Sequence, residues 1–136
     1  MNNMQIELFG HINIYFAVFL KFGTCLILGY LIGSNQKRRK KPVGIRTSIL
    51  ILTSSCLFLV AGCLYGDPNR IMAQVVSGVG FLGAGAIFKT SNDIHGMTTA
   101  TIIWCTASLG ILIGLGYIFM SLIIGTALYL IMRCKN

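Results

Sequence analysis

Long apolar runs that contain almost no charge fill most of this sequence, and they restrict its fold more than any other feature. A membrane-spanning helix takes roughly 20 predominantly apolar residues, so five such runs use about 100 of the 136 residues. Only 10% of the residues are charged, whereas soluble domains are about one quarter charged. We therefore predict an all-α, polytopic transmembrane protein, a single domain over residues 1–136. The predicted spans are about 12–32, 47–64, 70–88, 97–114 and 118–132, of which the fifth is short enough to be tilted or re-entrant.

Positive charge is concentrated in the polar segment that follows the first span. Residues 37–41 are all basic, Arg46 follows them, and the whole chain has a net charge of +8. Nucleic-acid-binding proteins carry such charge on a soluble fold, whereas here it lies directly after an apolar span. Lysine and arginine at such a place mark the cytoplasmic side of the membrane. We therefore predict a plasma-membrane protein with its N-terminus outside and its C-terminus in the cytoplasm, and no nucleic-acid partner.

The third span is rich in small residues at helical spacing. Ala73, Ser77, Gly80 and Ala84 follow at i, i+4, i+7 and i+11, so they form one continuous stripe on a helix. In membranes, small residues let helix backbones approach closely, and Gln74 beside the stripe can hydrogen-bond to a neighbouring helix. The predicted helix-packing residues of this span are Ala73, Ser77, Gly78, Gly80, Gly83, Ala84 and Gly85.

The first span holds a lysine, Lys21, near its middle. A lysine at the bilayer centre costs roughly 2.5–3.5 kcal/mol on insertion scales. Two interpretations stay open. The side chain either snorkels to the outer interface, or it contacts a helix terminus, a polar face such as that of Ser77 or Thr101, or a partner protein. Gly29 and Gly33 near the end of the span form a small-xxx-small pair that suits close helix packing.

Acidic residues are few and lie at the predicted membrane edges: Glu7, Asp67 and Asp93. Asp67 precedes a proline, which the first turn of a helix tolerates, so we predict a helix start there. Asp67 and Arg70 are expected to form a local cap and ion pair. A dehydrated cation needs charged oxygen ligands, and no carboxylate lies at mid-depth. A Mg²⁺ transporter or channel therefore stays only as the alternative function, because backbone carbonyls at a glycine-rich break can replace side-chain ligands.

Catalytic and metal-binding patterns give no further prediction. His11 and His95 lie at span edges, so a Ser–His pair within the membrane has no members, and Ser77 is interpreted as a packing residue. The five cysteines form no C-x-x-C pair, and four of them lie inside apolar runs, which matches neither a zinc site nor a disulfide framework. We therefore predict no enzymatic activity, no cofactor and no metal site.

Three segments carry a resemblance to a known family. DPNRIMAQVVSGVGFLGAGAIFKTSNDIHGMTTATIIWCTASLGILIGLG, residues 67–116, resembles the MgtC/SapB family of bacterial membrane proteins. KPVGIRT, residues 41–47, is similar to the basic P-x-G-x-R-T loop of that family, and LKFGTCLILGYLIGSNQKRRKK, residues 20–41, is similar to its first helix and basic tail. The resemblance covers about residues 15–130.

The resemblance implies a set of family-motif residues. They are Lys21, Gly44, Arg46, Thr47, Asp67, Arg70, Gln74, Gly78, Gly80, Gly83, Gly85, Gly96, Thr99 and Trp104. Two departures stand out. Asn35 and Gln36 occupy the place of a family Glu-Arg pair, and the chain resembles the short, SapB-like form without the soluble C-terminal domain of the virulence-associated members.

The resemblance also implies a function. The family is associated with magnesium limitation, acid tolerance and survival inside host cells, and some members are implied to restrain the F-type ATP synthase through membrane contacts. We therefore expect a non-enzymatic protein of the bacterial inner membrane that regulates other membrane proteins through helix contacts, with self-association as a second use of the same contacts.

Overall fold

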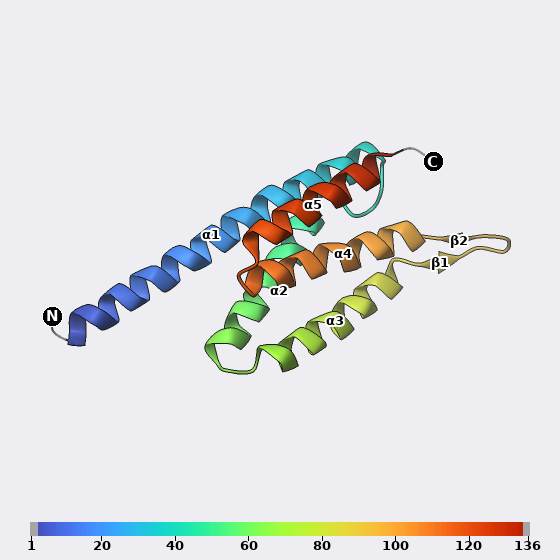
Figure 1. Cartoon of the computed structure of the whole chain (residues 1–136). Coiled ribbons are helices and arrows are strands. Elements are labelled where there is room, and N and C mark those ends of the chain that lie inside the picture. The colour runs from blue at the N-terminus through green and yellow to red at the C-terminus, as the bar shows by residue number, and fades with distance from the viewer. Residues whose placement is uncertain (1–2, 135–136) are drawn as a thin grey trace.

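Five helices and one short hairpin make up the computed structural model, which describes the backbone of residues 3–134 and the side chains of residues 13–134. The elements are α1 (Asn3–Arg38), α2 (Ile45–Leu64), α3 (Pro68–Gly85), β1 (Phe88–Lys89), β2 (Ile94–His95), α4 (Met97–Gly114) and α5 (Ile118–Arg133). The predicted all-α architecture of five helices is confirmed (Figure 1). The side chains of Glu7 and His11, which were assigned to a membrane edge, lie outside the described residues.

The helix boundaries agree with those predicted from the sequence, except at α1 and α3. α1 continues beyond both predicted limits, and its N-terminal half projects from the bundle (Figure 1). α3 ends at Gly85, three residues before the predicted limit, because the backbone N–H groups of Ala86 and Ile87 bond to the carbonyls of Gly83 and Ala84 and close the helix. The polar segment that follows is not an irregular loop but an antiparallel hairpin, in which Phe88 pairs with His95.

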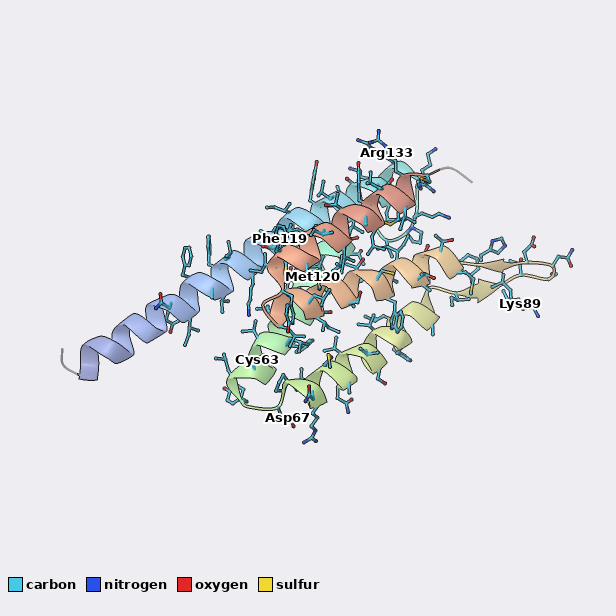
Figure 2. All side chains as sticks on the ribbon, in the orientation of Figure 1. Cys63, Asp67, Lys89, Phe119, Met120 and Arg133 are labelled. Atoms are coloured by element: carbon cyan, nitrogen blue, oxygen red, sulfur yellow. The ribbon has the colours of Figure 1, made fainter. Side chains whose placement is uncertain are left out.

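Length and hydropathy mark the bundle as a membrane domain. Among the described residues, three helical segments are long and apolar enough to cross a bilayer, Asn13–Arg38, Ile45–Leu64 and Met97–Gly114, while α5 is apolar but shorter. Large apolar side chains point outward around the bundle, among them Phe119 and Met120 (Figure 2). Such a surface is unfavourable in water and matches lipid tails.

α2 lies at the centre of the bundle and packs against α1, α3 and α4, while α5 packs against α1 and α4. The principal core cluster joins Cys25 and Leu28 of α1 to Leu52 of α2 and to Leu109 and Ile113 of α4. A second cluster joins Ile51 of α2 to Val79 of α3 and Ile103 of α4.

Glycines set the close contacts between these helices. A Cβ added at Gly29 of α1 would lie 2.8 Å from the Cα of Ile49, and Gly33 meets the backbone of Ile45. The predicted small-xxx-small pair therefore packs on α2, as its spacing indicated. A second pair, Gly110 and Gly114 of α4, packs further along α2, against residues 52–59, and was not predicted from the sequence.

The turns between helices are short. α4 ends at Gly114 and α5 begins at Ile118, so the expected tight hairpin is confirmed. Gly116 in this turn has φ +98°, a left-handed conformation that L side chains rarely adopt. The same geometry makes the α4–α5 connection sensitive to substitution.

Candidate functional site

The start of α3 is fixed by a side-chain cap. The carboxylate of Asp67 accepts a hydrogen bond from the backbone N–H of Arg70 at 3.2 Å, and Pro68 occupies the first turn. The predicted cap is therefore confirmed. Within the described part of the chain, the side chains of Asp67 and Arg70 form no ion pair, and both are exposed.

One face of α3 packs on the rest of the bundle. Val79 and Gly83 are buried on it, and Ile71 and Val75 are half-buried. A Cβ added at Gly83 would lie 3.5 Å from the carbonyl oxygen of Ala100 in α4, which is ordinary van der Waals contact. These four residues recur every four positions, so a single side of the helix faces α2 and α4.

The small-residue stripe lies on the side of α3 that points away from this contact. Ala73, Ser77, Gly80 and Ala84 are all exposed, and we call this set the open face of α3. A Cβ added at Gly80 would meet no atom within 4 Å, and the same holds for Gly78 and Gly85. Of the seven helix-packing residues predicted on this span, only Gly83 is buried within the chain.

A groove of about 480 Å³ runs between α2 and α3, and no residue of the open face lines it. Its walls are mostly apolar, with Phe58 from α2 and Leu82 from α3 among them, and Gln74 is the largest polar residue in it. The hydroxyl of Ser54 donates to the carbonyl oxygen of Leu50 within its own helix at 2.7 Å. In the described part of the chain no hydrogen bond reaches the Gln74 amide, so this polar group is left for lipid, water or a partner.

Lys21 contacts a helix terminus, one of the interpretations that the sequence left open. Its Nζ donates a hydrogen bond of 2.7 Å to the carbonyl oxygen of Gly114, the last residue of α4. Carbonyls at a helix C-terminus lack intrahelical donors and carry the negative end of the helix dipole, so an ammonium group is a favourable partner there. Lys21 is half-buried in this position and does not contact Ser77 or Thr101.

The remaining predicted residues are distributed over both ends of the bundle. Arg46 and Thr47 are exposed in the first turn of α2, whereas Thr99 is buried in the first turn of α4. Trp104 lies in the middle of α4 and is 55% exposed. Because α2 is about 30 Å long, the structure does not bring Arg46 together with Asp67 and Arg70 at its other end. Gly44 and Gly96 are the N-cap residues of α2 and α4.

Two buried amides were not predicted as structural residues. Asn35 Nδ2 donates to the carbonyl oxygen of Tyr129 at 3.4 Å, and Gln36 Nε2 lies 3.3 Å from the sulfur of Met132. Both amides are buried and join the end of α1 to the end of α5. Two polar residues directly before the basic run were the available signal, but their partners on α5 are 94 and 96 positions away in the chain.

Carboxylates are not gathered anywhere in the described residues, which contain no group of three His, Cys, Asp or Glu side chains suited to a metal ion. Asp67 lies at one end of α3, and the hairpin that holds Lys89 and Asp93 lies at the other end (Figure 2). The length of α3, 18 residues or about 27 Å, separates the two acids.

Comparison with known proteins places these features in a family. The model of the MgtC family matches residues 22–136. The chain is 37% identical to Protein MgtC of Salmonella typhimurium over 123 residues, which are 89% of this chain and 52% of that protein. It is 38% identical to Protein SapB of Bacillus subtilis over 112 residues, 74% of this chain and 48% of that protein. It is 44% identical to Protein MgtC of Brucella abortus over 95 residues, 68% of this chain and 40% of that protein.

The chain thus spans about half the length of the curated relatives that it matches. No solved structure matches it at a significant level.

Proposed function

The chain belongs to the MgtC family of membrane proteins, and from that premise we propose that it regulates another membrane complex through helix contacts made by the open face of α3. The regulation serves adaptation to low magnesium or to acid stress in the bacterial inner membrane. No catalytic step is part of this function, because the protein acts by binding.

The observation that carries the proposal is that several glycines of the other helices contact neighbouring helices, whereas the small residues on the open face of α3 are exposed. Gly29 and Gly33 of α1, Gly110 and Gly114 of α4 and Gly125 of α5 lie against neighbouring helices of the same chain. On α3, by contrast, Gly80 has open space where a side chain would be. Small residues cost helix stability of up to about 1 kcal/mol for each glycine, and in a membrane they are useful where another helix packs on them.

The amide of Gln74 is a second observation that supports the proposed helix contact. An amide facing lipid tails without a hydrogen-bond partner is unfavourable, and polar side chains of this kind commonly bond across helix interfaces. A second helix placed along the open face would reach the Gln74 amide at the edge of the α2–α3 groove. By family resemblance the F-type ATP synthase is one candidate partner, and a second copy of this chain is the other.

The orientation of the bundle is part of the proposal. The basic segment between α1 and α2 and the end of α5 lie at the same end of the bundle, because Asn35 contacts Tyr129 there. Lysine and arginine mark the cytoplasmic side, so this end faces the cytoplasm and Asp67 faces outward.

The test uses bulky residues on the open face. Gly80→Leu and Ala84→Leu, alone and combined, are expected to abolish co-purification of the partner in mild detergent and to change the oligomeric state if copies associate. Gly23→Leu in α1 is the matched control, because a Cβ there also meets nothing within 4 Å. The proposal fails if the open-face variants insert normally and keep the same partners and oligomeric state as the control.

Magnesium transport is the alternative function. It would need oxygen ligands along a path, and the length of α3 separates Asp67 from Asp93. Among the described residues, uncharged oxygens such as backbone carbonyls would therefore have to supply most of the ligands. Purified protein in liposomes decides between the two. Saturable, protein-dependent Mg²⁺ flux that Asp67→Asn or Lys21→Met abolishes would replace the regulatory proposal.

A further inference from the structure

A second groove lies at the basic end of the bundle, between α4 and α5, and it contains no residue of α3. Its volume is about 380 Å³, within the range of ligand pockets, and Arg39 stands among the residues that line it. We propose that this groove binds an anionic phospholipid, with an acyl chain along the groove and the phosphate at Arg39.

The walls of the groove suit an acyl chain. Leu128 and Ile131 of α5 and Ile102 of α4 supply apolar surface. Three threonines line the α4 side, of which Thr98 is exposed and forms no side-chain hydrogen bond with the described residues. The other two do not demand a polar ligand, because their hydroxyls bond within the helix: Thr101 donates to Met97 O at 2.9 Å and Thr106 to Ile102 O at 2.7 Å. Their methyl groups therefore complete an apolar lining.

The mouth of the groove suits a phosphate. One nitrogen of the Arg39 guanidinium, Nη2, donates to the carbonyl oxygen of Cys134 at 3.1 Å, which holds the group beside the end of α5. A guanidinium has five N–H donors, so others stay available to phosphate oxygens. Arg38 at the end of α1 and Arg133 at the end of α5 add positive charge close by (Figure 2 labels Arg133).

The apolar walls and the basic mouth of the groove together favour a ligand that has both an acyl chain and a negative charge. No acidic side chain is among the described residues that line the groove, so its charge complements an anion. A free phosphate does not occupy the apolar walls, and a zwitterionic lipid, whose own ammonium group offsets its phosphate, gains less from Arg39 than an anionic lipid does. Basic pockets between transmembrane helices on the cytoplasmic side bind anionic headgroups in this way.

The experiment measures lipid binding to the purified full chain in detergent by native mass spectrometry. Both phosphatidylglycerol and phosphatidylcholine carry a phosphate, but only phosphatidylglycerol has a net negative charge. It is therefore expected to bind about fivefold more tightly, the factor that one arginine beside an anionic lipid implies. Arg39→Gln should remove this preference. Arg70→Gln, which removes one charge at the opposite end of the bundle, should preserve it.

The groove itself is tested with a matched pair of threonines. Thr101→Trp fills the groove and should weaken phosphatidylglycerol binding, whereas Thr126→Trp should not, because Thr126 is an exposed threonine of α5 with the same internal hydrogen bond and lies outside the groove. Ile131→Trp on the opposite wall serves as a second filling variant if Thr101→Trp does not insert.

Three results would overturn the proposal. The first is equal binding of the two lipids, and the second is a phosphatidylglycerol preference that Arg39→Gln, Thr101→Trp and Ile131→Trp all leave unchanged. The third is full competition by glycerophosphoglycerol, the headgroup without acyl chains, which would show a phosphate site that makes no use of the groove. Loss of binding on addition of a membrane-protein partner, with no lipid preference in its absence, would instead assign the groove to protein.

Discussion

At the scale of single residues, the hydrogen bond between Lys21 and Gly114 explains how a lysine is kept in an apolar helix. The ammonium group meets the carbonyl at the end of α4, a group that no backbone donor within the described residues satisfies. The pair therefore compensates two unfavourable groups at once, a charge near lipid and an orphan carbonyl. Sequence alone identified Lys21 as unusual but left its partner open, because Gly114 is 93 positions away.

Lys21→Met is expected to lower the free energy of unfolding in detergent by roughly 1–2 kcal/mol, since the charged hydrogen bond to Gly114 is lost. The yield of inserted protein should not fall, because methionine is more apolar than lysine. Thermal unfolding followed by circular dichroism, together with the yield of inserted protein, measures both effects. Lys21→Arg, which keeps a donor and a charge, is the control. Equal stability of Lys21→Met and the parent chain would show that the lysine merely snorkels.

At the scale of helices, α2 is the element on which the bundle depends, because glycine pairs from α1 and α4 both pack closely on it, the first at Ile45 and Ile49 and the second at residues 52–59. The Gly29–Gly33 pair was predicted because it stands alone near the end of an apolar run. The Gly110–Gly114 pair was not, since polar and apolar residues are spread around α4 and its sequence does not tell which face meets α2. On α3 the sequence favoured the small-residue stripe as the packing face, whereas the apolar residues Ile71, Val75 and Val79, spaced four apart on the other side, face the bundle.

Gly110→Ala and Gly80→Ala are expected to have opposite effects on stability. A Cβ at Gly110 would meet the carbonyl of Leu52 and lie 2.8 Å from the Cβ of Ser55, so unfolding should become easier by about 1–3 kcal/mol. A Cβ at Gly80 meets nothing, and alanine is the better helix former, so stability should stay unchanged or rise by up to about 1 kcal/mol. Melting temperatures in the same detergent compare the two. A loss at Gly80 equal to that at Gly110 would mean that α3 has an undetected contact.

The positions of helices were predictable, and the reasons are local. α4 begins after Gly96 and ends at Gly114 as predicted, because polar and glycine-rich segments bound an unbroken apolar run. The excess length of α1 at its C-terminal end was missed because Gly33, Ser34 and Asn35 are typical of helix ends, whereas the helix continues through them to Arg38. The hairpin was missed because strands of two residues are too short to show a pattern.

At the scale of the whole molecule, charge and topology give one consistent arrangement. The ends of α1 and α5 and the hairpin with Lys89 lie at one end of the bundle, and the α2–α3 turn with Asp67 lies at the other (Figures 1 and 2). Each end has an exposed cysteine that can be labelled to determine its side of the membrane: Cys63 near the α2–α3 turn and Cys134 after α5.

Single-cysteine variants should therefore label asymmetrically. In right-side-out membrane vesicles, a membrane-impermeant maleimide is expected to modify the variant that retains Cys63 and to spare the variant that retains Cys134. Permeabilised vesicles, in which both should react, provide the control. The reverse pattern would place the basic end outside and would remove the cytoplasmic assignment of the lipid groove.

The overhang of α1 has a consequence for the membrane itself. The apolar segment Asn13–Arg38 of α1 has 26 residues, about 39 Å, whereas α4 with 18 residues covers about 27 Å and α5 with 16 covers about 24 Å. A hydrocarbon core of about 30 Å is shorter than the α1 segment, close to the length of α4 and longer than α5. Lipids around this protein must stretch on one flank and shorten on the other, or the bundle must tilt. Where the lipids adapt, each molecule is the source of a thickness gradient in the bilayer around it.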